Sequence, residues 1–322
     1  MGRRRFPVSN HCDGEHFFNP HAPAGRSLGD LIEWQRTRHA VPWPAHVDVP
    51  PQPPPPSQVA PGRVAVTFVG HSTFLLRTAT TVVVTDPVFT THAGPFGRFG
   101  PKRVRVPGVA LEAMPPAGIV LVSHNHYDHL QPTSLHAFQQ RGKPVFVAPL
   151  GLGAYLSGLG LAHVIELDWW DAASIGAARV TCVPAQHFSA RTPFDRNRTL
   201  WCGFVIDTGG SRIYFAGDSG YSPHFAEIGA HLPNIDVALI PIGAYEPRWF
   251  MQPMHMNPVE AVRAHLDVRP RVSIGMHFGT FRLTDEGIDD PIRALEESRS
   301  VDGVASEAFR VLPFGSTMLF DR

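Results

Sequence analysis

The chain has 322 residues, of which 43% are hydrophobic, and its formal net charge is zero. That length suits one large α/β domain or two small ones, and the balanced charge excludes the globally basic surface typical of nucleic-acid-binding proteins. Nowhere do 18 consecutive apolar residues occur, so an ordinary transmembrane helix is excluded. The basic start lacks the apolar run of a secretory signal, and three cysteines cannot form a complete disulfide framework, so we expect a cytoplasmic protein.

The first 62 residues predict an N-terminal arm rather than a domain. One short helix is expected over Leu28–Arg38, with Ser27 as its N-cap. Eight prolines then fall between Val41 and Pro56, which favours polyproline II and excludes a regular helix. We interpret this stretch as a solvated linker or a strap on the main domain, and a proline-rich ligand for a partner is the alternative.

Residues 63–322 predict a single α/β domain. Its strands are expected in short β-branched runs separated by turn signals. In chain order they are Val64–Val69, Thr81–Thr85, Gly118–Ser123, Val145–Val147, Val180–Val183, Leu200–Asp207, Arg212–Phe215, Ile235–Ile240 and Val272–Met276. Helices are expected over Thr133–Gln140 and after the capping pairs Asn257-Pro258 and Asp290-Pro291. The segment His71–Thr80 is interpreted as a connection between the first two strands.

A long loop, Thr90–Gly108, is rich in glycine and proline and carries four cations, Arg98, Lys102, Arg103 and Arg105. Loops of this length without regular structure are usually functional. The cations are either simply solvated or in contact with an anionic substrate or membrane surface. The sequence leaves both interpretations open.

The segment His124–Leu130 concentrates metal-binding side chains at the end of a predicted strand. Residues two apart in extended backbone point the same way, so His124 and His126 can reach one ion together. Asp128 and His129 follow after the chain turns and can reach a second point a few ångströms away. Imidazole and carboxylate are the ligands that zinc prefers in hydrolytic sites, so the pattern predicts a two-metal centre. A histidine-rich surface loop is the alternative interpretation.

Three further metal-capable residues, His187, Asp218 and His277, share one context, because each lies just past a predicted strand. Any one alone would more often be a loop or core residue than a ligand. Their common placement favours convergence with the first cluster at one edge of a sheet.

The spacing His-x-His-x-Asp-His, followed by His, Asp and His, resembles the ligand order of dinuclear hydrolases with the metallo-β-lactamase fold. The resemblance assigns the seven residues to two zinc ions: His124, His126 and His187 to one, Asp128, His129 and His277 to the other, and Asp218 to both as a bridge. Iron or manganese in place of zinc stays open. The implied fold class is α/β, a four-layer αβ/βα sandwich with two mixed sheets face to face and helices outside.

Within that superfamily, the chain resembles the N-acyl phosphatidylethanolamine-hydrolysing phospholipases D from about Arg63 to Leu295. The stretch Pro241–Met251 is the most specific, since the whole superfamily shares the metal motif. The other matching stretches are Gly100–Arg103, Ser123–Leu130, Glu166–Trp170, Leu200-Trp201, Phe215–Tyr221 and His277–Phe281. The domain 63–322 is therefore expected to be the catalytic one.

This resemblance implies a zinc-dependent phosphodiester hydrolase that releases N-acylethanolamine and phosphatidic acid. A hydroxide held between two metal ions would attack phosphorus, because coordination lowers the pKa of water from 15.7 to about 7. Three residues are the catalytic candidates: Asp218, which positions the hydroxide, Asp128, and His255, which binds the phosphate or protonates the leaving oxygen. The substrate-binding candidates are His255, Tyr245, Trp249 and Phe250.

Two other functions stay open at this point. A lactonase or esterase of the same fold would use the same centre, because the metal ions polarise a carbonyl as readily as a phosphoryl group. A non-catalytic binding protein would keep zinc only for structure. The expected partners are an N-acyl phospholipid and the inner face of a membrane, contacted peripherally, without nucleic acid. Homo-oligomer formation is left open.

Overall fold

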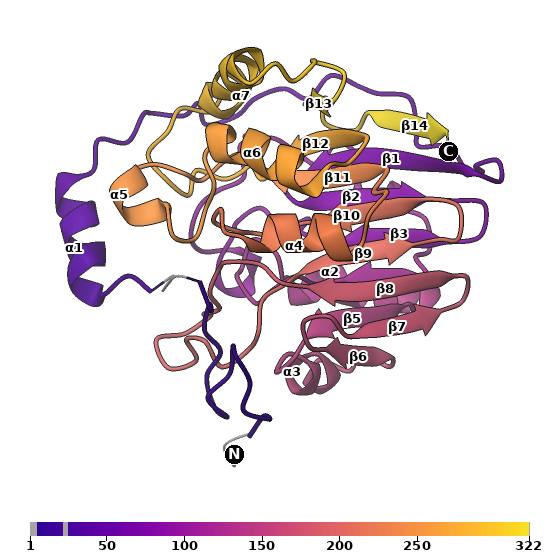
Figure 1. Cartoon of the computed structure of the whole chain (residues 1–322), viewed down its shortest axis with the longest axis horizontal. Helices are drawn as coiled ribbons and strands as arrows, with labels where there is room; N and C mark the ends of the chain where they lie inside the picture. Colours follow the sequence, from indigo (N-terminus) through magenta and orange to yellow (C-terminus); the bar gives the residue numbers. More distant parts are fainter. Residues whose placement is uncertain (1–4, 22–24, 322) are drawn as a thin grey trace.

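Two mixed sheets of seven strands each lie face to face in the computed structural model, which describes residues 5–21 and 25–321 (Figure 1). In spatial order, the first sheet contains β14 (Thr317–Asp321), β1 (Arg63–Gly70), β2 (Thr73–Arg77), β3 (Val82–Thr85), β4 (Ile119–Leu121), β5 (Val145–Pro149) and β6 (Val164–Leu167). The second contains β13 (Phe309–Arg310), β12 (Val272–Met276), β11 (Val237–Pro241), β10 (Arg212–Phe215), β9 (Gly203–Asp207), β8 (Ala178–Val183) and β7 (Ala172–Ile175).

Helices lie on the outer faces of both sheets and beside one edge. The helices are α1 (Leu28–Thr37), α2 (Pro132–Gly142), α3 (Gly153–Gly158), α4 (His224–His231), α5 (Arg248–Met251), α6 (Pro258–Val268) and α7 (Asp290–Val301). Phe138 of α2 and Leu156 of α3 pack on the outside of the first sheet. Phe225 of α4 and Val262 of α6 pack against the second. The four-layer sandwich implied by the resemblance is therefore confirmed.

The space between the sheets is filled by side chains that alternate along the strands. In β1, Val64, Val66 and Phe68 belong to this central core together with Phe204 of β9. Residues two apart on a strand face the same side, so the alternation directs one row of each strand into the core. Burying apolar area in this way, at about 25 cal/mol per Å², is the main term holding the two sheets together.

The predicted strands and helices are found, but the interpretation of His71–Thr80 as a connection was wrong. This segment contains β2, which pairs antiparallel with both β1 and β3. The turn from β1 into β2 is short because Gly70 and His71 both have positive φ, 140° and 57°. The sequence interpretation missed a tight turn that needs no cluster of Pro, Asn or Asp.

The N-terminal arm lies against the main domain. Its helix α1 begins as predicted at Ser27, whose side chain accepts a hydrogen bond from Asp30 N while the Asp30 side chain reaches back to Ser27 N. The proline-rich stretch is extended, and Val41 N donates to Asp285 O, while Trp43 donates its indole N–H to Glu286 O. These contacts favour the strap over the solvated linker. None of the helices that the structure describes has the length and apolar character needed to cross a bilayer.

Candidate metal centre

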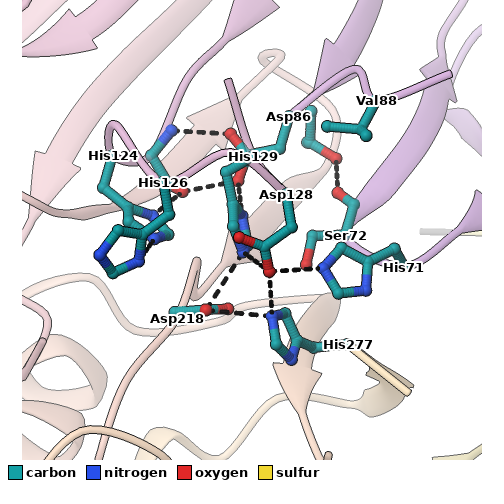
Figure 2. Close-up of polar contacts among 12 residues, drawn as sticks. His71, Ser72, Asp86, Val88, His124, His126, Asp128, His129, Asp218 and His277 are labelled. Carbon is teal, nitrogen blue, oxygen red and sulfur yellow. Dashed lines mark hydrogen bonds and ion pairs between the residues drawn. The ribbon is translucent and has the colours of Figure 1, made fainter. Parts of the chain in front are cut away.

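The seven predicted ligands meet at one edge of the sandwich. His124 begins the loop after β4, Asp218 and His277 come just after β10 and β12, and His187 follows β8. Strands β10 and β12 both run parallel to β11, and β4 runs parallel to its neighbours β3 and β5. The carboxyl ends of parallel strands share an edge, which is where ligands usually bind in α/β sheets. Figure 2 shows six of these side chains pointing toward one another, namely those of His124, His126, Asp128, His129, Asp218 and His277.

Three imidazoles form the first group. His126 Nδ1 lies 2.9 Å from His124 Nε2 and 3.2 Å from His187 Nε2. Burial lowers the pKa of His126 to about 3 and that of His187 to about 4, so both rings are neutral. A neutral imidazole can present a lone pair on one of its two nitrogens. These three converging nitrogens can therefore bind one cation together.

The second group combines carboxylates with imidazoles. Asp218 Oδ2 lies 3.1 Å from His129 Nε2 and 3.0 Å from His277 Nε2, and it is 3.9 Å from His187 Nε2 in the first group. Asp128 Oδ2 lies 3.3 Å from His277 Nε2 and 3.5 Å from His129 Nε2. The Asp218 oxygen therefore lies between the two groups, in the position that the sequence prediction assigned to a bridging ligand.

The outward nitrogens of three ligand histidines are held by oxygen atoms. His129 Nδ1 is 2.6 Å from Asp86 Oδ2, and His187 Nδ1 is 2.8 Å from Met254 O. His124 Nδ1 is 2.9 Å from the Ser123 hydroxyl, which itself donates to Asp86. Each Nδ1–H thereby has an oxygen acceptor. Nε2 is then the ring atom that faces the centre and that can bind a metal ion in its deprotonated form.

Several polar atoms at the centre lack the partner that burial demands. Among the residues that the structure describes, Asp218 Oδ1, His129 Nε2 and His255 Nδ1 are buried without a hydrogen bond. Burial would lower the pKa of His129, but the carboxylates of Asp218 and Asp128 outweigh burial and hold it well above its usual value. A divalent cation would supply the same positive charge. The imidazole and carboxylate donors therefore fit a pair of metal ions, and this donor set suits zinc, iron and manganese alike.

The centre forms the floor of a cavity of about 670 Å³. His126, Asp128, Asp218 and His255 line its polar end, and His255 Nδ1 is 4.0 Å from Asp218 Oδ2. The remaining walls are largely apolar and include Leu28, Leu31, Trp34, Phe188, Phe250, Met251, Met254 and Leu283. The cavity thus joins a charged, metal-binding floor to an apolar upper part.

Helix α1 of the arm supplies part of that apolar wall, which the sequence interpretation missed. Trp34 stacks on Phe250 with 4.9 Å between ring centroids, and its indole N–H donates to Asp285 Oδ2 at 2.8 Å. Figure 1 shows α1 and α5 at the same edge of the molecule. Leu28, Leu31 and Trp34 recur at helical spacing, and this pattern was the available signal.

Two of the predicted substrate-binding residues lie elsewhere. Phe250 and His255 line the cavity above the candidate metal centre, but Tyr245 and Trp249 line a neighbouring cavity of about 720 Å³ on the other side of Trp34. Neighbouring residues on a helix point about 100° apart, so α5 turns Trp249 away from the side that Phe250 faces. The structure does not bring Tyr245 and Trp249 to the metal centre, and their role in substrate binding stays a prediction.

The loop cations divide into two kinds. Arg103 donates to Thr90 O and Val88 O, and burial lowers the pKa of its guanidinium to about 10. Arg105 donates to Gly279 O and pairs with Asp289. These two arginines hold the loop to the domain, whereas Arg98 and Lys102 are exposed.

Comparison with known proteins identifies relatives of the chain. A family model described as the β-lactamase superfamily domain matches residues 81–278. An uncharacterized Mycobacterium tuberculosis protein is 42% identical over 238 residues, which are 72% of this chain but only 63% of that protein. The Caenorhabditis elegans N-acyl-phosphatidylethanolamine-hydrolyzing phospholipase D 1 is 38% identical over 243 residues, 72% of this chain and 68% of that protein. The structure of Igni18, a metallo hydrolase from Ignicoccus hospitalis, shares the fold with a TM-score of 0.62 at 24% identity, covering 81% of this chain and 99% of that one.

The geometry predicts close to two metal ions per chain, the number that a two-metal site holds. Replacing the bridging candidate, Asp218→Asn, should weaken metal binding by about 100-fold or more, since loss of even an outer partner costs about 10–100-fold. Metal analysis after dialysis against a weak chelator measures this loss. Asp236→Asn is the matched control. The Asp236 carboxylate lies away from the metal centre, where it accepts a hydrogen bond from Arg212 N and pairs with Arg271. A single tightly held ion, unaffected by changes at Asp128 and His277, would contradict the dinuclear assignment.

Proposed function

Because the chain belongs to the β-lactamase superfamily, we propose that this metal-dependent hydrolase cleaves a phosphodiester, releasing N-acylethanolamine and phosphatidic acid from an N-acyl phosphatidylethanolamine. The observation that carries the proposal is the cavity, whose metal-binding floor and apolar walls fit a substrate with an anionic diester and long acyl chains. The C. elegans relative supports the same choice, because its name states that reaction.

The chain's own residues would orient the reaction. Two bound zinc ions would supply positive charge for the phosphoryl oxygens and lower the pKa of water to about 7. Asp218 Oδ2, between the two groups of donors, is placed to orient the attacking water. Burial lowers the pKa of His255 well below its usual value, so its ring is neutral. The single N–H of this ring, whose Nδ1 has no hydrogen-bond partner in the described part of the chain, can bind a phosphate oxygen. Asp128 faces the same cavity and fixes the second group of ligands.

Access to a bilayer substrate requires a surface that can dock on lipid, and we propose that this surface surrounds the cavity. On α1, Leu28, Leu31 and Ile32 are 73%, 40% and 52% exposed. The loop after β3 leaves the sheet at the same edge as the metal centre, and it exposes 84% of Phe96 and 62% of Phe99. Apolar side chains near the interface, with cations beside them, are what peripheral membrane binding needs.

The first prediction tests the reaction itself. Metal-loaded protein should release N-acylethanolamine from N-acyl phosphatidylethanolamine in mixed micelles, and mass spectrometry of both products measures it. Asp218→Asn should remove this activity while Asp236→Asn retains it. Good hydrolysis of lactones or carboxylic esters without phosphodiester cleavage would instead favour the lactonase or esterase. Two bound ions without any hydrolysis would favour the binding protein.

The second prediction concerns the arm. Leu31 and Ile32 are adjacent on α1 and both exposed, but of the two only Leu31 lines the cavity. Leu31→Ser should therefore raise KM for long acyl chains more than for short ones, by about 10-fold, since burying a leucine side chain contributes about 1.5–3 kcal/mol. Monomeric substrates of increasing chain length measure the effect without a membrane. Ile32→Ser is the matched control. Equal changes of KM in both variants would contradict the hypothesis that α1 forms a wall against which the acyl chain packs.

The third prediction concerns the exposed loop cations. Changing both Arg98 and Lys102 to Ser should lower activity on anionic vesicles by about 30-fold at low salt, because each cation near such a surface contributes about 1 kcal/mol. Activity on a short, soluble phosphodiester should not change. Lys143→Ser with Arg179→Ser removes the same charge from exposed positions at the other end of the strands. Equal losses on vesicles and on the soluble substrate would contradict docking through this loop.

A further inference from the structure

The turn between β1 and β2 places a histidine without an assigned role against the metal centre. His71 is only 2% exposed, and its φ of 57° is uncommon for a residue other than glycine. The preceding Gly70, with φ of 140°, has no room for a side chain, since a Cβ there would approach the Phe314 ring to 2.9 Å. Strained backbone of this kind persists only where its surroundings hold it, and it clusters at functional sites.

His71 contacts two of the seven predicted ligands through two different groups. Its Nε2 lies 3.1 Å from Asp128 Oδ2 (Figure 2), and its carbonyl oxygen accepts a 2.9 Å hydrogen bond from His277 N. The two imidazole rings also lie together, with centroids 4.1 Å apart, and the edge of the Phe281 ring closes the other side at 5.2 Å. Asp128 comes from the first sheet and His277 from the second, so His71 joins ligands across the sandwich.

The direction of the hydrogen bond between His71 and Asp128 follows from their chemistry. A carboxylate only accepts hydrogen bonds, so the His71 Nε2–H donates to Asp128 Oδ2, which lies 3.1 Å away. His277 Nε2 and His129 Nε2 lie 3.3 and 3.5 Å from this same oxygen. The donated hydrogen bond therefore fixes the oxygen that faces the other two ligands of the second group.

We propose that His71 is a positioning residue of the metal centre, which orients the Asp128 carboxylate through its Nε2–H and the His277 backbone through its carbonyl oxygen. The inference rests on the metal centre of the proposed function but not on the identity of the substrate. Position 71 lies outside the segment that the family model matches, and it is not one of the seven ligands predicted from the sequence. An outer partner that orients a ligand typically contributes 10–100-fold to metal affinity.

Two variants at this position separate the hydrogen bond from the backbone. His71→Phe keeps a ring but removes the N–H, whereas His71→Gln keeps an amide N–H at about the same reach. Both replacements lose the preference of histidine for positive φ, so this loss affects both variants alike. The difference in metal affinity between them therefore measures the contribution of the hydrogen-bond donor. His265→Phe is the matched control, because His265 on α6 is also buried and the change removes one hydrogen bond, to Ser273.

The experiment measures zinc binding to purified full-length chain by competition with a chromophoric chelator, without any substrate. We expect wild type and His265→Phe to hold two ions, and His71→Phe to bind one of them about 10–100-fold more weakly while the other is unchanged. His71→Gln should recover most of that affinity. Thermal unfolding of the metal-free proteins provides the second readout, in which His71→Phe and His265→Phe should lose similar stability.

Three results would overturn the role of His71. The first is wild-type affinity for both ions in His71→Phe, the second is equal weakening of both ions, and the third is a Gln variant as weak as the Phe variant. If wild type itself does not bind two ions, the metal centre fails as well, whereas two ions without phosphodiester cleavage would overturn only the proposed substrate.

Discussion

Two buried carboxylates surrounded by imidazoles are the constraint on which the rest of this structure depends. Asp128 and Asp218 lie within 3.5 Å of His129 and His277, and these four side chains are almost fully withdrawn from water. The free-energy cost of burying an unpaired charge exceeds the net stability of a folded domain, so such a cluster requires compensating positive charge. Histidines alone supply it only by taking up protons, whereas a divalent cation supplies it while leaving the rings neutral.

The sandwich makes this cluster achievable because it separates two tasks, the placement of the ligand residues and the orientation of their side chains. The strands and the core between the sheets hold the ends of β4, β10 and β12 in fixed relative positions. Loops beyond those ends carry the ligands, and outer contacts then orient the rings of His124, His129 and His187. Asp86 illustrates the second task, because its carboxylate accepts from Ser123 N, the Ser123 hydroxyl and His129 Nδ1. The donors are therefore arranged before any ion binds.

The arm shapes the cavity above the metal-binding floor. Without α1, this floor would lie in a more open depression, and the apolar wall contributed by Leu28, Leu31 and Trp34 would be missing. The arm is anchored through polar contacts, since Arg38 and Trp34 both bind the Asp285 carboxylate. The metal-binding side chains and part of the cavity wall thus come from different parts of the chain.

The sequence alone determined features whose causes are local. The strands β10 and β12 were predicted with the bounds that the structure shows, because β-branched and aromatic runs between turn signals specify them. The metal-binding candidates were found because their spacing and their positions after strands are visible in the chain itself. Asp86, in contrast, directly follows the predicted strand Thr81–Thr85, and nothing local indicates that His129 will lie beside it.

The tertiary structure decided everything that depends on contacts between distant residues. Trp34 meets Asp285 across 251 positions, so no local pattern could place the arm at the cavity. The separation of Phe250 from Trp249 depends on how the short helix α5 is rotated against Trp34, and the role of His71 depends on two sheets meeting. Side-chain chemistry can be predicted from residue type and spacing, but which groups share a cavity is decided by packing, because packing joins segments that are far apart along the chain.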